Sequence, residues 1–221
     1  MTNSLLDNLT YKSNKPTFLT KITPEMLKKL NHRQLETISG IQTANQLFQE
    51  AKLDNISDFM TNLVMAESNI GGDKEGSYSS GPSQIDRIRY KDLQDKAASG
   101  EKETINRASL ANKLLELDSR YKEGIDILNL TDDERKDPMI NSLLTRMALA
   151  TIEEKIPSNL SEQAVYWKKE WNSRLGKGTP EHFINQVQIY NLKLNNKTHD
   201  GTPLKDIKSD EKGNYYIKYE E

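Results

Sequence analysis

The chain has 221 residues, enough for one good-sized domain with appended ends, and 31 basic residues nearly balance 33 acidic ones. The net charge of -2 argues against the basic surface of a nucleic-acid-binding protein, and the lack of cysteine excludes disulfides and thiolate metal sites. The sequence offers neither a basic start followed by an apolar stretch nor a run of membrane-spanning length, so we expect no signal peptide and no membrane partner.

The first part of the chain is predicted to be a polar arm followed by helices. Residues 1–22 show no hydrophobic period and are expected to form a flexible N-terminal arm. A proline after a threonine cap predicts a short helix within 23–30. Apolar residues at helical spacing predict a helix over 33–51 and another over 55–70, which a pair of glycines ends. The Gly- and Ser-rich residues 71–83 are expected to be loop.

The second part continues as helices and changes character near its end. Helical spacing predicts further helices over residues 90–98, 104–116, 137–154, 161–171 and 179–190, the fourth capped at Ser158 or Ser161. Residues 214–219 alternate like a strand, with Gly213 in a hairpin turn. We therefore predict a mainly α protein with an arm (1–22), one helical domain (23–195) and a tail or small β-hairpin (196–221).

One carboxylate stands out because of its setting. Phe59, Leu63 and Glu67 share one face of the predicted helix over 55–70, and that face is otherwise apolar. Burial raises the pKa of a carboxyl group, and the negative end of a helix dipole disfavours ionisation further. Both effects favour a glutamic acid still protonated near neutral pH, as a general acid for glycoside cleavage requires. A single glutamate at a helix end is, however, usually just solvated.

The motifs around this acid resemble the lysozyme-like superfamily, specifically soluble lytic transglycosylases and goose-type lysozymes. In that family a helix ends in Glu-Ser, and a turn Gly-Leu-Met-Gln with an aliphatic residue follows. This chain has Glu67-Ser68 and then Gly81-Pro82-Ser83-Gln84-Ile85. Asp86 matches the aspartate after this turn in goose-type lysozymes, and Asp137-Pro138 and Trp171-Asn172 are similar to later family regions.

The chain also departs from the family pattern. Pro82-Ser83 replaces Leu-Met, which alters the apolar platform under the sugar, and Trp171 stands where the family has Tyr. The segment 92–136 is a long charged insertion that could form a lid, a partner surface or nothing functional.

The resemblance implies roles for individual residues. Glu67 is the expected general acid, and Asp86, Asp73 and Glu75 are candidates for the second carboxylate that a hydrolase needs. Several roles have a structural alternative: Asp86 as a helix cap, Ser68 as a helix C-terminal hydroxyl that braces Glu67 or bonds backbone, Gly81 as an ordinary turn glycine, and Trp171 as a core residue. The expected substrate-binding residues are Ser68, Tyr78, Gly81, Gln84, Trp171 and Asn172.

The resemblance implies a peptidoglycan-degrading glycosidase that cleaves the β-1,4 MurNAc–GlcNAc linkage by lytic transglycosylation or by hydrolysis. No cofactor and no metal are expected, because the three histidines lie far apart. The missing signal suggests a bacteriophage protein made in the host cytoplasm that acts on periplasmic peptidoglycan. It would be an endolysin or a virion-associated lysin, whose partners are glycan strands and other virion proteins. The alternatives are an inactive lysozyme-like structural or glycan-binding virion protein, or a helical interaction protein.

Overall fold

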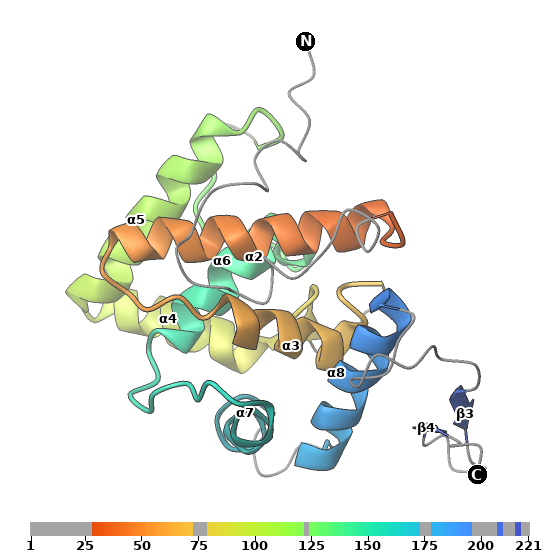
Figure 1. Cartoon of the computed structure of the whole chain (residues 1–221). Helices are drawn as coiled ribbons and strands as arrows, with labels where there is room; N and C mark the ends of the chain where they lie inside the picture. Colours follow the sequence, from red (N-terminus) through yellow and green to blue (C-terminus); the bar gives the residue numbers. More distant parts are fainter. Residues whose placement is uncertain are drawn as a thin grey trace.

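The computed structural model describes residues 28–72, 79–121, 124–172, 178–195, 207–209 and 215–217. This part of the chain is mainly α-helical, as predicted (Figure 1). The helices are α2 (His32–Glu50), α3 (Ser57–Ser68), α4 (Arg87–Ala98), α5 (Lys102–Leu117), η3 (Glu134–Lys136), α6 (Pro138–Leu149), α7 (Leu160–Tyr166), η4 (Trp167–Trp171) and α8 (Pro180–Asn195). The strands are β1 (Ser79–Ser80), β2 (Ile85–Asp86), β3 (Ile207–Ser209) and β4 (Tyr215–Ile217).

The centre of the fold is α6. Asp137 caps its first turn, Pro138 occupies its first position, and every residue from Ile140 to Leu149 is buried. Helices α2, α4 and α5 pack against it. On α2, Gly40 permits close approach, since a Cβ there would meet the Pro138 carbonyl oxygen at 2.9 Å. Helix α6 is apolar on most of its sides, and a helix of this kind has to be buried, so α6 forms the centre of the core.

A second group of helices, α3, α7 and α8, packs through aromatic rings. The ring of Phe59 on α3 meets that of Tyr166 edge-on at 5.3 Å and lies over that of Phe183 at 6.5 Å. All three side chains are almost fully buried. These contacts set the position of α3, and therefore of its C-terminal turn, relative to α7 and α8.

Most helix predictions are confirmed, but several boundaries differ. Residues 28–30 form a turn rather than the predicted helix. Helix α3 ends at Ser68, before the glycine pair, because Asn69 and Ile70 take left-handed φ values of 60° and 56°. Helix α7 begins after Asn159, whose side chain accepts from the Glu162 N–H, so neither predicted serine cap is used.

The prediction for α6 was too long at its C-terminal end. The helix ends at Leu149 instead of continuing to Glu154. Arg107 on α5 donates to the carbonyl oxygen of Ala150 at 3.3 Å. The N–H of Ile152 then donates to the carbonyl oxygen of Leu149, three residues earlier. This bond belongs to a tighter turn than that of an α-helix, in which the N–H bonds the residue four positions earlier.

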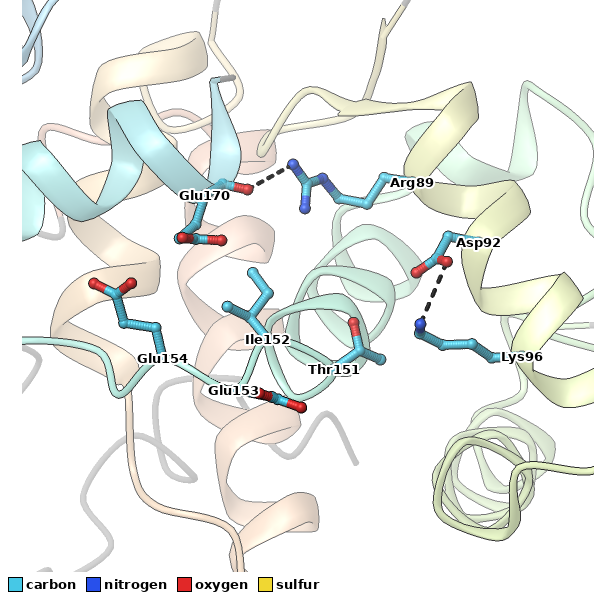
Figure 2. Close-up of a pocket in the computed structure, with 8 residues that line it drawn as sticks. All are labelled: Arg89, Asp92, Lys96, Thr151, Ile152, Glu153, Glu154 and Glu170. Carbon is cyan, nitrogen blue, oxygen red and sulfur yellow. Dashed lines mark hydrogen bonds and ion pairs between the residues drawn. The ribbon is translucent and has the colours of Figure 1, made fainter. Parts of the chain in front are cut away.

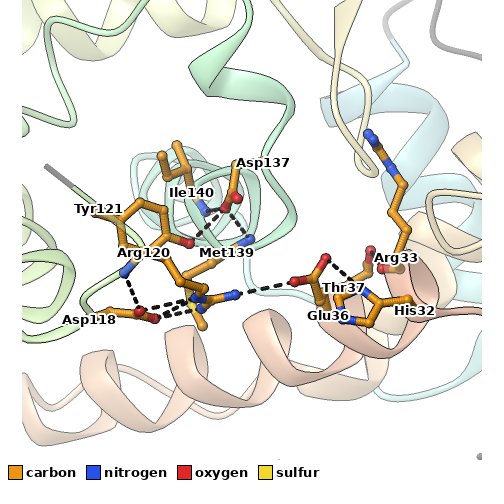
Figure 3. Close-up of polar contacts among 10 residues, drawn as sticks. All are labelled: His32, Arg33, Glu36, Thr37, Asp118, Arg120, Tyr121, Asp137, Met139 and Ile140. Atoms are coloured by element: carbon orange, nitrogen blue, oxygen red, sulfur yellow. Dashed lines mark hydrogen bonds and ion pairs between the residues drawn. The ribbon is translucent and has the colours of Figure 1, made fainter.

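The charged insertion is built into the helical body. Arg120 pairs with Asp118 and also reaches Glu36 on α2 at 3.3 Å (Figure 3). The hydroxyl of Tyr121 donates to Asp137 at 2.9 Å, the residue that caps α6. These contacts tie the segment after α5 to both α2 and α6, which does not suit a lid that swings freely.

The C-terminal strands form a two-stranded antiparallel sheet in which Ile207 pairs with Ile217. This confirms the predicted strand near 214–219, whereas Gly213 and the arm 1–22 lie outside the described residues. Within the described ranges, no helix is both long and apolar enough to span a bilayer.

Candidate active site

Glu67 lies in the last turn of α3, on the face that it shares with buried Phe59 and Leu63. Its carboxyl group is partly buried, and Oε1 accepts a hydrogen bond of 2.7 Å from Nε1 of Trp167. Burial raises the pKa of Glu67 to about 7, against smaller opposing effects of the Trp167 hydrogen bond and the positive charge of Arg89. The predicted protonated acid near neutral pH therefore has a physical basis in this fold.

The π-helical turn η4 places two tryptophans against the site. Asn172 N–H bonds the carbonyl of Trp167, five residues back, at 2.8 Å. The Trp167 indole donates to Glu67, whereas the Trp171 indole donates to the carbonyl oxygen of Ser83 at 3.1 Å. One turn of helix thus fixes both the acid and the glycine-containing turn.

That turn, Gly81 to Gln84, connects the two strands of a short hairpin in which Ser80 pairs with Ile85. Gly81 has a φ of +71°, and a Cβ there would lie 2.3 Å from Nδ2 of Asn141. The close approach that requires glycine is therefore to α6 and not to a ligand. Gln84 has a φ of 53°, and its Nε2 donates to the Gly81 carbonyl at 2.9 Å.

Ser83 faces the interior. Its N–H and its hydroxyl both donate to Oδ1 of Asn141, at 2.9 and 2.8 Å, and its hydroxyl lies 2.5 Å from that of Thr145. Ser83 is buried against α6, so its side chain is not exposed to a sugar, and the effect of Pro82-Ser83 on a sugar platform stays a prediction. The serine instead provides hydrogen bonds that fix the turn to the core helix.

Ser68 joins the end of α3 to the same turn. Its buried hydroxyl donates to the carbonyl oxygen of Pro82 and accepts from the N–H of Gly71 at 2.8 Å. These backbone contacts occupy the hydroxyl, so it braces the region around Glu67 and is not open to a substrate.

Asp86 acts as the N-cap of α4, where its carboxylate accepts from the Arg89 N–H at 2.6 Å. Arg89 in turn donates to the carbonyl oxygens of Glu170 and Trp171, both at 2.9 Å, and its guanidinium lies 4.3 Å from the centre of the Trp171 ring. Burial lowers the pKa of Arg89. This arginine fastens α4 to η4 and brings a positive charge to Glu67.

The remaining predicted residues are less well placed for a ligand. Trp171 is 5% exposed, which suits a core residue better than an open stacking surface. Asn172 is half-buried, and its Oδ1 accepts from Nζ of Lys168 at 3.2 Å. Asp73 and Tyr78 lie outside the described residues. Among the residues that are described, no three His, Asp or Glu side chains gather as a metal site.

A groove of about 680 Å³ lies next to Arg89 (Figure 2). Its lining comes from α4, from the segment after α6 and from η4, and Glu67 is not part of it. Arg89 lines this charged groove, and its positive charge also lowers the pKa of Glu67.

The functional residues that sequence reasoning missed are Trp167 and Arg89. Trp167 lies one helical turn before Trp171 in the sequence, but no sequence pattern indicates that its indole contacts Glu67. Arg89 carried a weaker signal still, as one arginine in the first turn after a capping aspartate.

No family model, curated protein or solved structure matches the chain. The chemistry of the site therefore has to be inferred from its own geometry.

Proposed function

We propose that the chain is a peptidoglycan-degrading glycosidase in which Glu67 is the general acid that protonates the leaving oxygen of the MurNAc–GlcNAc linkage. The observation that carries the proposal is the Glu67 carboxyl group, whose pKa burial raises to about 7 and which the Trp167 indole orients. A carboxylic acid with this pKa keeps its proton in about half of the molecules at pH 7 and still gives the proton up readily. The lysozyme-like fold itself is part of the proposal, which the helical architecture and the Glu-Ser and Gly-x-x-Gln motifs support.

When Glu67 gives its proton to the sugar oxygen, it becomes a negatively charged carboxylate. The site contains groups that stabilise this charge. The Trp167 N–H and the positive charge of Arg89 both favour the ionised form of Glu67. Before the reaction, the two groups therefore limit the rise in the Glu67 pKa that burial causes. After the proton has moved to the sugar oxygen, they stabilise the Glu67 carboxylate. The same carboxylate can then accept a proton from the attacking hydroxyl group in the second half of the reaction.

The geometry favours lytic transglycosylation over hydrolysis. A two-carboxylate enzyme needs a second acidic group across the scissile bond. Asp86, the candidate among the described residues, has its carboxylate bonded to the first turn of α4. In a transglycosylase the substrate acetamido group assists instead, and the muramoyl 6-hydroxyl attacks to give a 1,6-anhydro product. Asp73 and Glu75, outside the described residues, are the remaining candidates for the hydrolytic route.

We further propose the biological setting that the resemblance implies, a bacteriophage endolysin or virion-associated lysin. The second candidate function is an inactive lysozyme-like virion protein that binds glycan or has a structural role. The burial of Ser68 and Trp171 favours that candidate, because these predicted substrate-binding side chains are engaged within the protein.

The two functions are separated by comparing the chain with its Glu67→Gln variant on dye-labelled sacculi. The substitution keeps an oxygen that accepts from Trp167 but removes the acidic proton. We expect release of soluble dye from the unchanged chain and at least a hundredfold slower release from the variant, in line with the contribution of a general acid. Equal release by both proteins would remove Glu67 from the mechanism, and binding to sacculi without release by either would favour the inactive protein.

A further inference from the structure

Gly178 lies against the outer edge of the Trp167 indole. A Cβ at position 178 would meet Cη2 of this ring at 2.4 Å and Cζ2 at 3.2 Å. Carbon atoms pack comfortably at about 3.5 to 4.0 Å, so the ring would have to move by about 1 Å to admit even a methyl group. The position therefore has to lack a side chain for as long as the indole stays where it is.

The indole has little freedom to move away. Trp167 is 1% exposed, and the centre of its ring lies 5.2 Å from that of Phe183. Its Nε1 donates to the carboxyl group of Glu67 at 2.7 Å. Because the indole is a rigid ring system, a displacement that relieves a contact at Cη2 also displaces Nε1. Protein interiors are close-packed, so such a displacement disturbs the hydrogen bond to Glu67 or the contact with Phe183.

The start of α8 holds the groups that surround the ring. Gly178 precedes Thr179, whose hydroxyl accepts from the N–H of His182 at 3.2 Å. The carbonyl oxygen of Thr179 accepts from the N–H of Phe183 at 3.1 Å. These bonds fix Gly178 and Phe183 relative to each other in one capped helix start. Helix α8 also packs against α3, the helix that carries Glu67.

We infer that Gly178 is a positioning residue for the candidate acid: the space that it leaves lets the Trp167 indole reach Glu67, and it acts only through that indole. The inference rests on the proposed function for its catalytic consequence, because that function makes Glu67 the reacting group. Gly178 has no side-chain atom that could take part in the reaction itself. The other neighbour of a Cβ at this position is Nδ2 of Asn172, at 3.1 Å, and the test has to separate the two.

The test is a double-mutant cycle in the full-length chain, with Gly178→Ala and Trp167→Phe made singly and together. Phenylalanine lacks both the N–H that donates to Glu67 and the outer ring atoms that a Cβ at position 178 would meet. We therefore expect Gly178→Ala to have a large effect on its own and almost none when combined with Trp167→Phe. An effect through Asn172 or through the backbone would be the same in both backgrounds.

The first readout is the pKa of Glu67, followed by NMR of carbon-13-labelled glutamate carboxyl groups, with Glu67→Gln identifying the signal. Gly178→Ala should raise this pKa by about one pH unit, because the carboxylate loses a hydrogen bond that favours its ionised form. The charge of Arg89, which also lowers this pKa, is the same in every variant.

The second readout is cleavage of sacculi. In Gly178→Ala the alkaline limb of the kcat/KM profile should move up by the same pH interval as the Glu67 pKa. The value of kcat should fall about tenfold, because the carboxylate formed on proton transfer is less well stabilised. Gly100→Ala is the control glycine substitution, since no described atom lies within 4 Å of a Cβ there, and both readouts should stay unchanged.

Folding provides a further reading of the same cycle. If Gly178→Ala leaves too little folded protein to titrate, adding Trp167→Phe should restore folding, because it removes the ring atoms that clash. The inference is overturned if Gly178→Ala leaves the Glu67 pKa unchanged or shifts it equally in both backgrounds. It is also overturned if the double variant fails to fold when the single variant does.

The inference and the proposed function fail separately in this design. The NMR titration needs no activity, so a chain that releases nothing from sacculi but shows the expected pKa shifts would overturn the glycosidase proposal and leave the role of Gly178 in orienting Glu67 standing. Cleavage of sacculi with the same Glu67 pKa and the same pH profile in the unchanged chain and in Gly178→Ala would do the reverse.

Discussion

Nε1 of Trp167 lies 2.7 Å from Oε1 of Glu67, and the two residues are 100 positions apart in the sequence. The hydrogen bond joins the end of α3 to the π-helical turn η4. It acts on the acid in a definite direction, because a donor to a carboxylate favours the ionised form. The bond therefore lowers the Glu67 pKa that burial raises.

Replacing Trp167 by phenylalanine should shift the pH dependence of cleavage. The loss of the donor raises the Glu67 pKa further, so the alkaline limb of the kcat/KM profile should move to higher pH. The maximal rate should fall, because the carboxylate left after proton transfer lacks its partner. The measurement is a pH–rate profile from 5 to 9, in which an unchanged limb would show that Trp167 has no influence on the acid.

The raised pKa also predicts how stability depends on pH. Glu67 binds its proton more tightly in the folded chain, where its pKa is about 7, than in the unfolded chain, where a glutamate has its ordinary pKa of 4.5. The corresponding stabilisation is fully present below pH 4.5 and is lost as the pH rises through 7, which amounts to about 3 kcal/mol. In the Glu67→Gln variant no carboxyl group ionises at this position, so the variant does not lose this stabilisation as the pH rises. It should therefore have a higher free energy of unfolding than the unchanged chain at pH 8.

Urea unfolding at pH 5 and pH 8 tests this prediction. The free energy of unfolding of the unchanged chain should fall between the two values relative to that of the variant. Glu116→Gln, on the exposed surface of α5, serves as the charge-matched control. If the unchanged chain and Glu67→Gln lose equal stability, the carboxyl group is not buried in the way described.

Asp86→Asn separates a helix cap from a catalytic carboxylate. Asparagine caps helices about as well as aspartate, so both stability and cleavage rate should stay close to normal. Asp86→Ala should cost about 1 kcal/mol in the free energy of unfolding. A hundredfold or larger loss of kcat in Asp86→Asn, with normal stability, would instead identify Asp86 as a reacting group.

The glycine of the hairpin turn is expected to be required for folding. Gly81→Ala places a Cβ 2.3 Å from Asn141 Nδ2 at a φ of +71°. Gly100→Ala is a matched control, since its φ is +86° and nothing lies within 4 Å. Both variants place an alanine at a positive φ that favours glycine, but only Gly81→Ala also creates a clash. The free energy of unfolding of Gly81→Ala should therefore be lower than that of Gly100→Ala by about 1 to 3 kcal/mol. Equal losses in urea unfolding would show that Asn141 does not pack against this turn.

The helical elements could be predicted because they depend on local patterns. Apolar spacing indicated α2 and α8 closely, and the shared face of Phe59, Leu63 and Glu67 followed from helix geometry alone. The end of α6 could not be predicted in this way. At that end, Arg107 of another helix donates to the carbonyl oxygen of Ala150, a contact between distant residues that a local pattern does not show.

The candidate site was predictable only in part, for a similar reason. The apolar face around Glu67 could be predicted from one helix. The groups that act on Glu67 come from distant parts of the chain: Trp167 of η4 through a hydrogen bond and Arg89 of α4 through its charge. A π-helical turn has no signature in a 3.6-residue period, so the opposite attachments of Trp167 and Trp171 were not foreseen. For Ser68 and Gly81 the sequence left a substrate contact and a structural role open, and the structure shows the hydroxyl of Ser68 bonded to backbone and Gly81 packed against Asn141.

The most direct test of the account is mass spectrometry of the muropeptides that the chain releases from purified Gram-negative sacculi, with Glu67→Gln digested in parallel. The account predicts fragments that end in 1,6-anhydro-muramic acid from the unchanged chain and none from the variant. Reducing ends would contradict a mechanism with Glu67 as the sole carboxylate and would direct attention to Asp73 or Asp86. No release by the folded chain would contradict the glycosidase assignment itself.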